Sequence, residues 1–221
     1  MSEQPDDRSR RRVLAPVERI SEVLFGLIMV LTITGSLSVA EAGREDVRTM
    51  LIGALGCNLA WGLIDAVMYL MGCLSDQADG IRTVLAARNA ATPEQAHRAI
   101  ARAVPPLVAA VLQTAELERV RVHLRAIAEP PQRPRLEARD WWGALGVFLL
   151  VFVATFPVVV PFVLAHDVAR ALRVSNAIAI GMLFLTGYAF GRATRYHATG
   201  TGLAMVALGC VLVALTKALG G

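Results

Sequence analysis

The sequence has little of what a soluble enzyme or a disulfide-linked protein needs. It contains only three cysteines, Cys57, Cys73 and Cys210, and their spacing fits neither a disulfide framework nor a zinc site. It also lacks a serine nucleophile elbow, a phosphate-binding loop and a paired-histidine metalloprotease helix. We therefore expect a protein that is not an enzyme and has no resident cofactor, with cysteines that pack as small apolar side chains.

Apolar residues dominate the chain instead. Of its 221 residues 55% are hydrophobic, and the mean hydropathy is +0.53, which is too apolar for an ordinary soluble domain. Five stretches are long enough, or nearly so, to cross a bilayer core of about 30 Å. They cover residues 23–40, 50–71, 143–164, 174–191 and 199–216. The sequence thus predicts an all-α, polytopic membrane protein with five transmembrane helices.

Positive charge is distributed unevenly around these five spans. With the N-terminus inside, seventeen of the 22 Lys and Arg residues lie on the inner side and five on the outer side. This asymmetry predicts a cytoplasmic N-terminus, a cytoplasmic loop between spans two and three, and a C-terminus on the opposite side. The net charge of +4 is then explained by topology and contact with the lipid bilayer, and we expect no nucleic-acid partner.

The spans divide the chain into four parts. Residues 1–17 are predicted to be a disordered basic cytoplasmic tail, 18–72 hold helices one and two, 73–140 form a small helical cytoplasmic insert, and 141–221 hold helices three to five. Within the insert, Thr92 and Pro93 predict the start of a helix that ends near Val104. A second helix is expected over residues 107–127. In span three, Pro157 and Pro161 predict a kink.

One acidic residue, Asp65, lies inside the long apolar stretches. At that depth a carboxylate costs about 2.5–3.5 kcal/mol, so a function or a specific packing role is expected. Helical spacing puts it on one stripe with four other residues of span two, Asn58, Trp61, Met68 and Gly72. The carboxylate and the thioether of Met68 could form a transient site for a divalent transition metal, with Met29 of span one as a second thioether. Alternatively, a neutral Asp65 bonds to Asn58 or to a Ser or Thr of span one and holds the helices together.

Two further places carry candidate chemistry. Glu22 and Arg19 lie at the cytoplasmic mouth of span one, either as a gate and proton acceptor or as a surface ion pair. Small residues along span one predict close helix packing, either within one chain or between two copies of it. In the insert, Glu94 and His97 have the Glu-x-x-His spacing of a carboxylate metal site, although they occur once and a solvated surface is the alternative.

Four segments carry a pattern that resembles a known family. Span one, ERISEVLFGLIMVLTITGSLSVAEAG, contributes Glu22 and the pair Phe25-Gly26, and span two, NLAWGLIDAVMYLMGCLS, contributes Asp65 and Gly72. Span three contributes the proline-rich FPVVVPF, and the last span contributes the glycine-studded GLAMVALGCVLVALTKALGG. In order and spacing, these segments resemble the vacuolar iron transporter (VIT/CCC) family, which also has a long insert between helices two and three.

The resemblance implies a homodimer that exchanges iron or manganese for protons. Asp65 would be the central metal ligand or proton site, Met68 and Met29 soft ligands, Asn58 a helper and Glu22 an acid at the inner mouth. The sequence departs from the family pattern in four places: Ile28-Met29 stands where an Asn-Asp pair is usual, Tyr69 where a methionine is expected, Cys73 where a glutamate is expected, and the insert lacks glutamate clusters. These departures favour an alternative function, a non-transporting membrane scaffold or interaction protein that retains the bundle.

Overall fold

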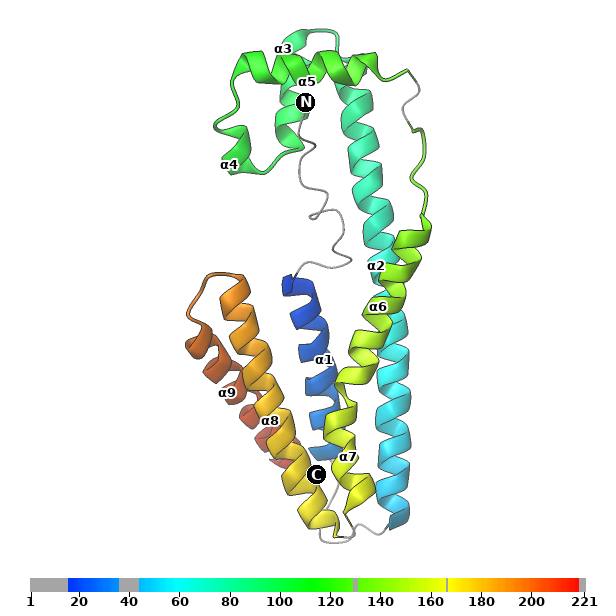
Figure 1. Ribbon diagram of the computed structural model, residues 1–221, viewed down its shortest axis with the longest axis vertical. Coiled ribbons are helices and arrows are strands. Elements are labelled where there is room, and N and C mark those ends of the chain that lie inside the picture. The colour runs from blue at the N-terminus through cyan, green and yellow to red at the C-terminus, as the bar shows by residue number, and fades with distance from the viewer. Residues whose placement is uncertain (1–15, 36–43, 129–130, 166, 219–221) are drawn as a thin grey trace, which may run out of the picture. The chain divides into compact units, whose positions relative to one another are not determined.

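The computed structural model describes residues 16–35, 44–128, 131–165 and 167–218, and these residues contain helices and no strand (Figure 1). The all-α prediction is therefore confirmed. The helices in chain order are α1 (Pro16–Gly35), α2 (Arg44–Asn89), α3 (Pro93–Arg102), α4 (Pro106–Ala109), α5 (Thr114–Ala126), α6 (Ala138–Ala154), α7 (Phe156–Leu164), α8 (Val168–Ala193) and α9 (Ala198–Ala218). All but two residues of the predicted basic tail lie outside the described residues.

The chain divides into two compact units. One comprises residues 1–69 and 141–221, and the other comprises residues 70–140. Helix α2 is continuous across the first boundary, because the apolar stretch of span two runs without a helix breaker into the polar sequence that follows it. The chain therefore enters the second unit in mid-helix and not at a turn.

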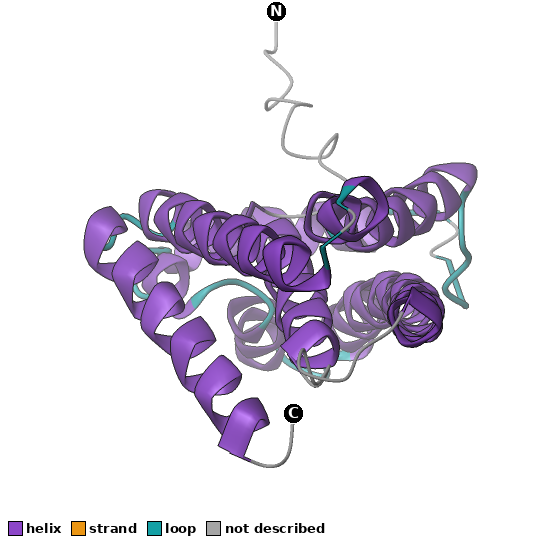
Figure 2. Ribbon diagram, turned by 90° about the horizontal axis from the view of Figure 1, so that it is seen from below, coloured by secondary structure: helices purple, strands orange, loops and turns teal. Residues whose placement is uncertain are grey.

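The first unit is a helical bundle (Figures 1 and 2). A core cluster of this unit lies between α1, α7 and α8. The core side chains are all apolar: Leu27, Val30 and Leu31 from α1, Val158 and Val159 from α7, and Ala179 and Leu183 from α8. Glycine allows α8 and α9 to approach each other closely. A Cβ on Gly187 would lie 2.8 Å from the carbonyl oxygen of Thr201 and 3.0 Å from the Cα of Gly202.

Four stretches of the described residues are long and apolar enough to cross a membrane. They are Val47–Asn89, Ala138–Leu164, Val168–Ala193 and Ala198–Leu215, and they correspond to the predicted spans two to five. Much of their surface is apolar and exposed, for example at Ile52, Leu63 and Val163. Such a surface indicates an integral membrane protein, because water does not solvate long apolar helices with so little burial.

The predicted distortion of span three is confirmed. The span is divided into α6 and α7 at Thr155, two residues before Pro157. Proline has no N–H to donate to the carbonyl four residues earlier, and its ring clashes with the preceding turn, so a continuous α-helix is interrupted there. The break is fully buried, since Thr155 has no exposed surface.

The second unit contains the end of α2 together with α3, α4 and α5. The predicted start of α3 is confirmed: Thr92 is its N-cap and accepts a hydrogen bond from the Gln95 N–H at 3.4 Å, and Pro93 follows as the first helical residue. Ala87 of α2 packs with Ala96 and Ile100 of α3 to form a small core.

The prediction of one helix over residues 107–127 was wrong. The structure has the single turn α4 and then α5, which begins at Thr114. Gln113 adopts an extended backbone with ψ 156°, and its N–H donates to the Glu116 side chain at 2.8 Å. This capping box starts a new helix where the apolar periodicity alone indicated continuation.

Candidate functional site

Asp65 lies in the contact between α2 and α6. Its exposed fraction is 9%, and it shares a helix face with Gly62, three residues before it. Gly62 packs against Phe148 of α6, and Tyr69, one turn after Asp65, packs against Gly143 of the same helix. The carboxyl group is therefore held between two α2–α6 contacts and does not face the surrounding lipid.

The Asp65 carboxyl has unused bonding capacity in this position. Its Oδ2 atom is fully buried and has no hydrogen-bond partner among the described residues. Such an atom is uncommon, because buried polar atoms in proteins normally have a partner and each exception calls for an explanation. The alternative in which Asp65 bonds to Asn58 is not observed, since the Asn58 amide group donates to α6 instead.

Asn58 stabilises the interrupted helix of span three. Its Nδ2 donates to the Thr155 hydroxyl at 2.9 Å and to the carbonyl oxygens of Val151 and Phe152, each at 3.3 Å. These carbonyls belong to the last turn of α6, where carbonyl groups have no partner within the helix. Asn58 is completely buried, so these bonds form out of contact with lipid and water. The structure thus places Asn58 in packing and not beside the Asp65 carboxyl.

The predicted stripe on α2 separates into a buried and an exposed part. Asn58 and Asp65 are buried, whereas Trp61 is 37% exposed and Met68 is 63% exposed. Gly72 is exposed too. The residues of α2 that contact α6 include Asn58 and Gly62, and this face is turned away from the exposed side chain of Met68. Met68 therefore does not share the buried environment of Asp65 within one chain.

Met29 contacts a residue that the sequence did not single out as functional. The Cys57 thiol donates to the Met29 thioether, with the two sulfur atoms 3.3 Å apart. Cys57 precedes Asp65 by eight residues, which is about 12 Å along a helix. Met29 is therefore paired with Cys57 and is not brought to Asp65. The side chain of the fifth candidate, Glu22, lies outside the described part of the chain.

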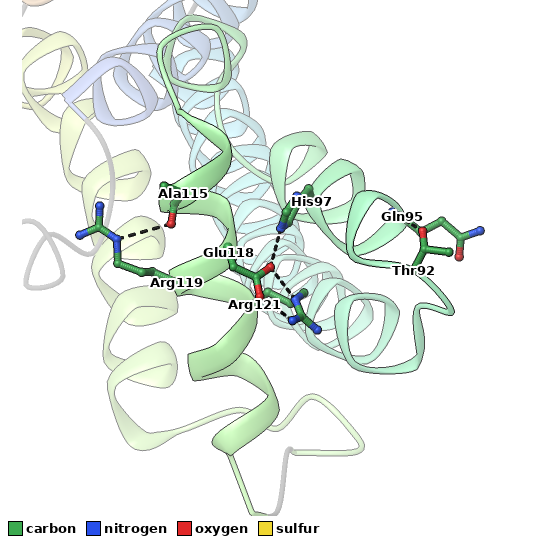
Figure 3. A network of polar contacts seen from close by, with 7 residues as sticks. All are labelled: Thr92, Gln95, His97, Ala115, Glu118, Arg119 and Arg121. Atoms are coloured by element: carbon green, nitrogen blue, oxygen red, sulfur yellow. Dashed lines mark hydrogen bonds and ion pairs between the residues drawn. The ribbon is translucent and has the colours of Figure 1, made fainter.

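In the second unit, a histidine, a glutamate and an arginine join α3 to α5 (Figure 3). His97 Nε2 lies 2.8 Å from Glu118 Oε2, and the Arg121 guanidinium donates to both oxygens of the same carboxylate. The hydrogen bonds from Arg121 and then from His97 lower the pKa of Glu118 to about 2. His97 is thus engaged by Glu118 of α5 and not by Glu94, the other residue of the candidate Glu-x-x-His pair.

A preformed cluster of metal ligands does not occur in the described part of the chain. No three His, Cys, Asp or Glu residues come together there in an arrangement that could hold an ion. A metal ion passing Asp65 would thus need further ligands from thioethers, backbone carbonyls, water or a second chain. This distinguishes the site from a structural metal centre, which has a closed set of protein ligands.

Comparison with known protein families identifies the bundle. The VIT family model matches residues 76–221, which is more than half of the chain. The chain belongs to the VIT family. The match covers the end of α2, most of the second unit and α6 to α9, so the expected vacuolar iron transporter membership is confirmed for this part. No curated protein matches the chain.

VIT family membership and the apolar helices together indicate an integral membrane protein with a role in metal-ion transport. All five candidate pathway residues, Glu22, Met29, Asn58, Asp65 and Met68, precede the matched residues. Their roles therefore depend on the geometry of α1 and α2 and not on the family match. The contact of Cys57 with Met29 was not predicted, because the periodicity of residues within α2 does not indicate which other helix each side of α2 contacts.

Proposed function

We propose that this VIT family member carries divalent metal ions, iron or manganese, across a bilayer in exchange for protons. In this proposal Asp65 is the residue that alternately holds the metal ion and a proton. The observation that carries the proposal is the fully buried Asp65 Oδ2 atom without a hydrogen-bond partner among the described residues. A buried acid normally pairs, binds a metal or stays neutral, and a carboxyl that alternates between the last two states is a proton-coupled carrier site.

The other candidates take supporting roles in this mechanism. Met68 lies on the exposed side of α2, and in this proposal a second copy of the chain covers that side in a homodimer. Its thioether is then a soft ligand at a separate position along the pathway and does not join Asp65 within one chain. Asn58 holds the junction of α6 and α7 through its hydrogen bonds, so that α6, the helix against which Asp65 lies, keeps a fixed position. Glu22 is the acid at the inner mouth of the pathway.

We further propose a topology of five spans, with α1 as the first. Its 20 residues give a length of about 30 Å, which matches the hydrocarbon core. The N-terminus and the insert of residues 73–140 then lie in the cytoplasm and the C-terminus lies on the opposite side, as the distribution of arginine favours. Protease digestion of sealed vesicles that contain the protein with a C-terminal tag tests this topology. If the side of the N-terminus is known, five spans put the tag on the opposite side of the membrane and four spans put it on the same side.

Metal uptake into proteoliposomes tests the transport proposal. We expect Fe²⁺ or Mn²⁺ to accumulate in vesicles that contain the protein, driven by an outward proton gradient, and Asp65→Asn to abolish this accumulation. Asp79→Asn is the matched control, since it makes the same change at an exposed position of the same helix, where Asp79 only pairs with Arg82. Asp79→Asn should transport like the wild type.

The same experiment decides between the transporter and the scaffold. The absence of a ligand cluster among the described residues is the observation that favours a scaffold. A scaffold predicts that vesicles with the protein take up no more metal than empty vesicles, and that Asp65→Asn changes nothing. Uptake equal to that of empty vesicles rejects transport, and an unchanged Asp65→Asn variant in vesicles that do take up metal rejects Asp65 as the carrier residue.

A further inference from the structure

A thiol and a thioether from two different helices meet in the first unit. Cys57 of α2 donates its Sγ–H to Met29 Sδ of α1, and the sulfur atoms are 3.3 Å apart. Cys57 is exposed on α2 and Met29 is half-buried, so the pair lies at the edge of the contact between α1 and α2 and is not enclosed in the core. The proposed transport mechanism assigns no role to this contact.

We propose that Cys57 and Met29 form a binding site for a soft monovalent cation, of the class of Cu⁺ and Ag⁺. Thiolate and thioether are the ligands that soft metal ions prefer, whereas carboxylates and carbonyls suit hard ions. A metal–sulfur bond is about 2.3 Å long, so two sulfur atoms at the observed separation would bind one ion at an angle of about 90°. The near-linear geometry that these ions adopt with two ligands needs the sulfur atoms about 4.6 Å apart, so binding requires rotation of the flexible Met29 side chain by somewhat more than 1 Å at its sulfur.

The charge balance selects a monovalent ion. Binding replaces the thiol proton by the metal, so that the S–H bond breaks, a thiolate–metal bond forms and the proton leaves to water. The thiolate carries one negative charge and the thioether none, so a complex with a monovalent ion is neutral. A divalent ion would leave one uncompensated positive charge beside apolar helices, which is costly in a membrane.

This site is separate from Asp65 and goes beyond the proposed transport function. Cys57 precedes Asp65 by eight residues, which is about 12 Å along the helix. The two groups also differ in chemistry, since one is a soft sulfur pair and the other a hard oxygen ligand. Binding at the sulfur pair is therefore expected whether or not the chain transports iron or manganese.

Calorimetric titration of the purified full-length protein in detergent with Ag⁺, without chloride, tests the proposal. We expect one tight site with release of one proton per ion. Cys57→Ser should remove this site, and Met29→Leu should raise its Kd at least tenfold. Cys210→Ser is the matched control, because Cys210 is also an exposed thiol on an apolar helix, and it should leave the tight site unchanged.

Met29→Leu is the decisive variant, because leucine has nearly the same volume and lacks only the thioether. A Kd within twofold of the wild type would show that silver binds a single thiol, and the proposed pair would be rejected. Equal losses in Cys57→Ser and Cys210→Ser would also reject it. X-ray absorption of the Cu⁺-loaded protein gives an independent reading, with two sulfur neighbours expected in the wild type and fewer in Met29→Leu. Asp65→Asn should bind Ag⁺ normally even if it no longer transports metal.

Discussion

The contact that holds Asp65 should be sensitive to the size of residue 62. A Cβ on Gly62 would lie 3.2 Å from the Cδ2 of Phe148 and 3.3 Å from its carbonyl oxygen, and the carbonyl cannot rotate away as a side chain can. Alanine would require a shift of a few tenths of an ångström. Valine adds two methyl groups beyond the Cβ, so α6 must move further before carbon contacts return to about 3.5–4.0 Å.

The structure permits an estimate of what Gly62→Val costs. Overpacking of this kind destabilises proteins by about 1–3 kcal/mol. Gly53→Val is the control, since position 53 lies in the same apolar helix and has no atom within 4 Å of the added Cβ. Both variants change the helix propensity of α2 equally, so this contribution cancels in their difference.

We would measure the difference in unfolding free energy by unfolding the two purified variants in mixed micelles with an increasing fraction of SDS. We expect Gly62→Val to lose about 1–3 kcal/mol of unfolding free energy relative to Gly53→Val. It should also lose metal uptake in proteoliposomes, because displacement of α6 opens the contact around Asp65. Equal stability and equal uptake of the two variants would show that α2 and α6 do not meet at Gly62, and would remove the basis for placing Asp65 in that contact.

Three further predictions concern other contacts. Gly187→Ala should cost about 1–3 kcal/mol relative to Gly181→Ala in the same assay, because a Cβ meets the α9 backbone at position 187 and open space at position 181. Asn58→Ala should cost about 1–2 kcal/mol, because the Nδ2 group of Asn58 donates hydrogen bonds to Thr155 and to two carbonyls of α6. Asn176→Ala should cost less, because the Oδ1 atom is without a partner in both residues and Asn176 has no such donated bonds among the described residues. The lowered pKa of Glu118 means that its stabilisation of the second unit is present above its ordinary value of 4.5 and is lost as the pH falls towards about 2. Hydrogen exchange of α3 and α5 over that pH range should show this loss in the wild type and in Glu137→Gln, whose ion pair is exposed, but not in Glu118→Gln.

Features that depend on neighbouring residues were readable from the sequence. The cap of α3 at Thr92 and the break near Pro157 follow from the local chemistry of a hydroxyl and of a proline ring. The start of α5 is local as well, but the glutamine at position 113 is a weaker cap signal than Ser, Thr, Asp or Asn, so the apolar periodicity misled the interpretation.

Features that depend on a second helix were not readable. Residues three and four apart lie on one broad side of a helix, and both Asn58 and Met68 lie on the same side as Asp65 by this spacing. The position of α6 decides between them, and the signal for it was the small residue Gly62, which permits close approach. The contact between Met29 and Cys57 likewise depends on how α1 lies against α2, which no pattern within either helix contains.

Substitutions of Asn58 and Asp65, two polar residues buried in α2, should differ in their effects on the unfolding free energy and on metal uptake. The cost of burying Asn58 is offset by its hydrogen bonds to the last turn of α6 and to Thr155, whereas Asp65 makes no such bond among the described residues. Asn58→Ala should therefore lower the unfolding free energy. Asp65→Asn, which has nearly the same shape, should leave it within about 0.5 kcal/mol of the wild type and yet abolish metal uptake. If Asp65→Asn instead lowers the unfolding free energy as much as Asn58→Ala does, the Asp65 carboxyl has a structural role in helix packing, because a group needed only for transport would not contribute to the stability of the bundle.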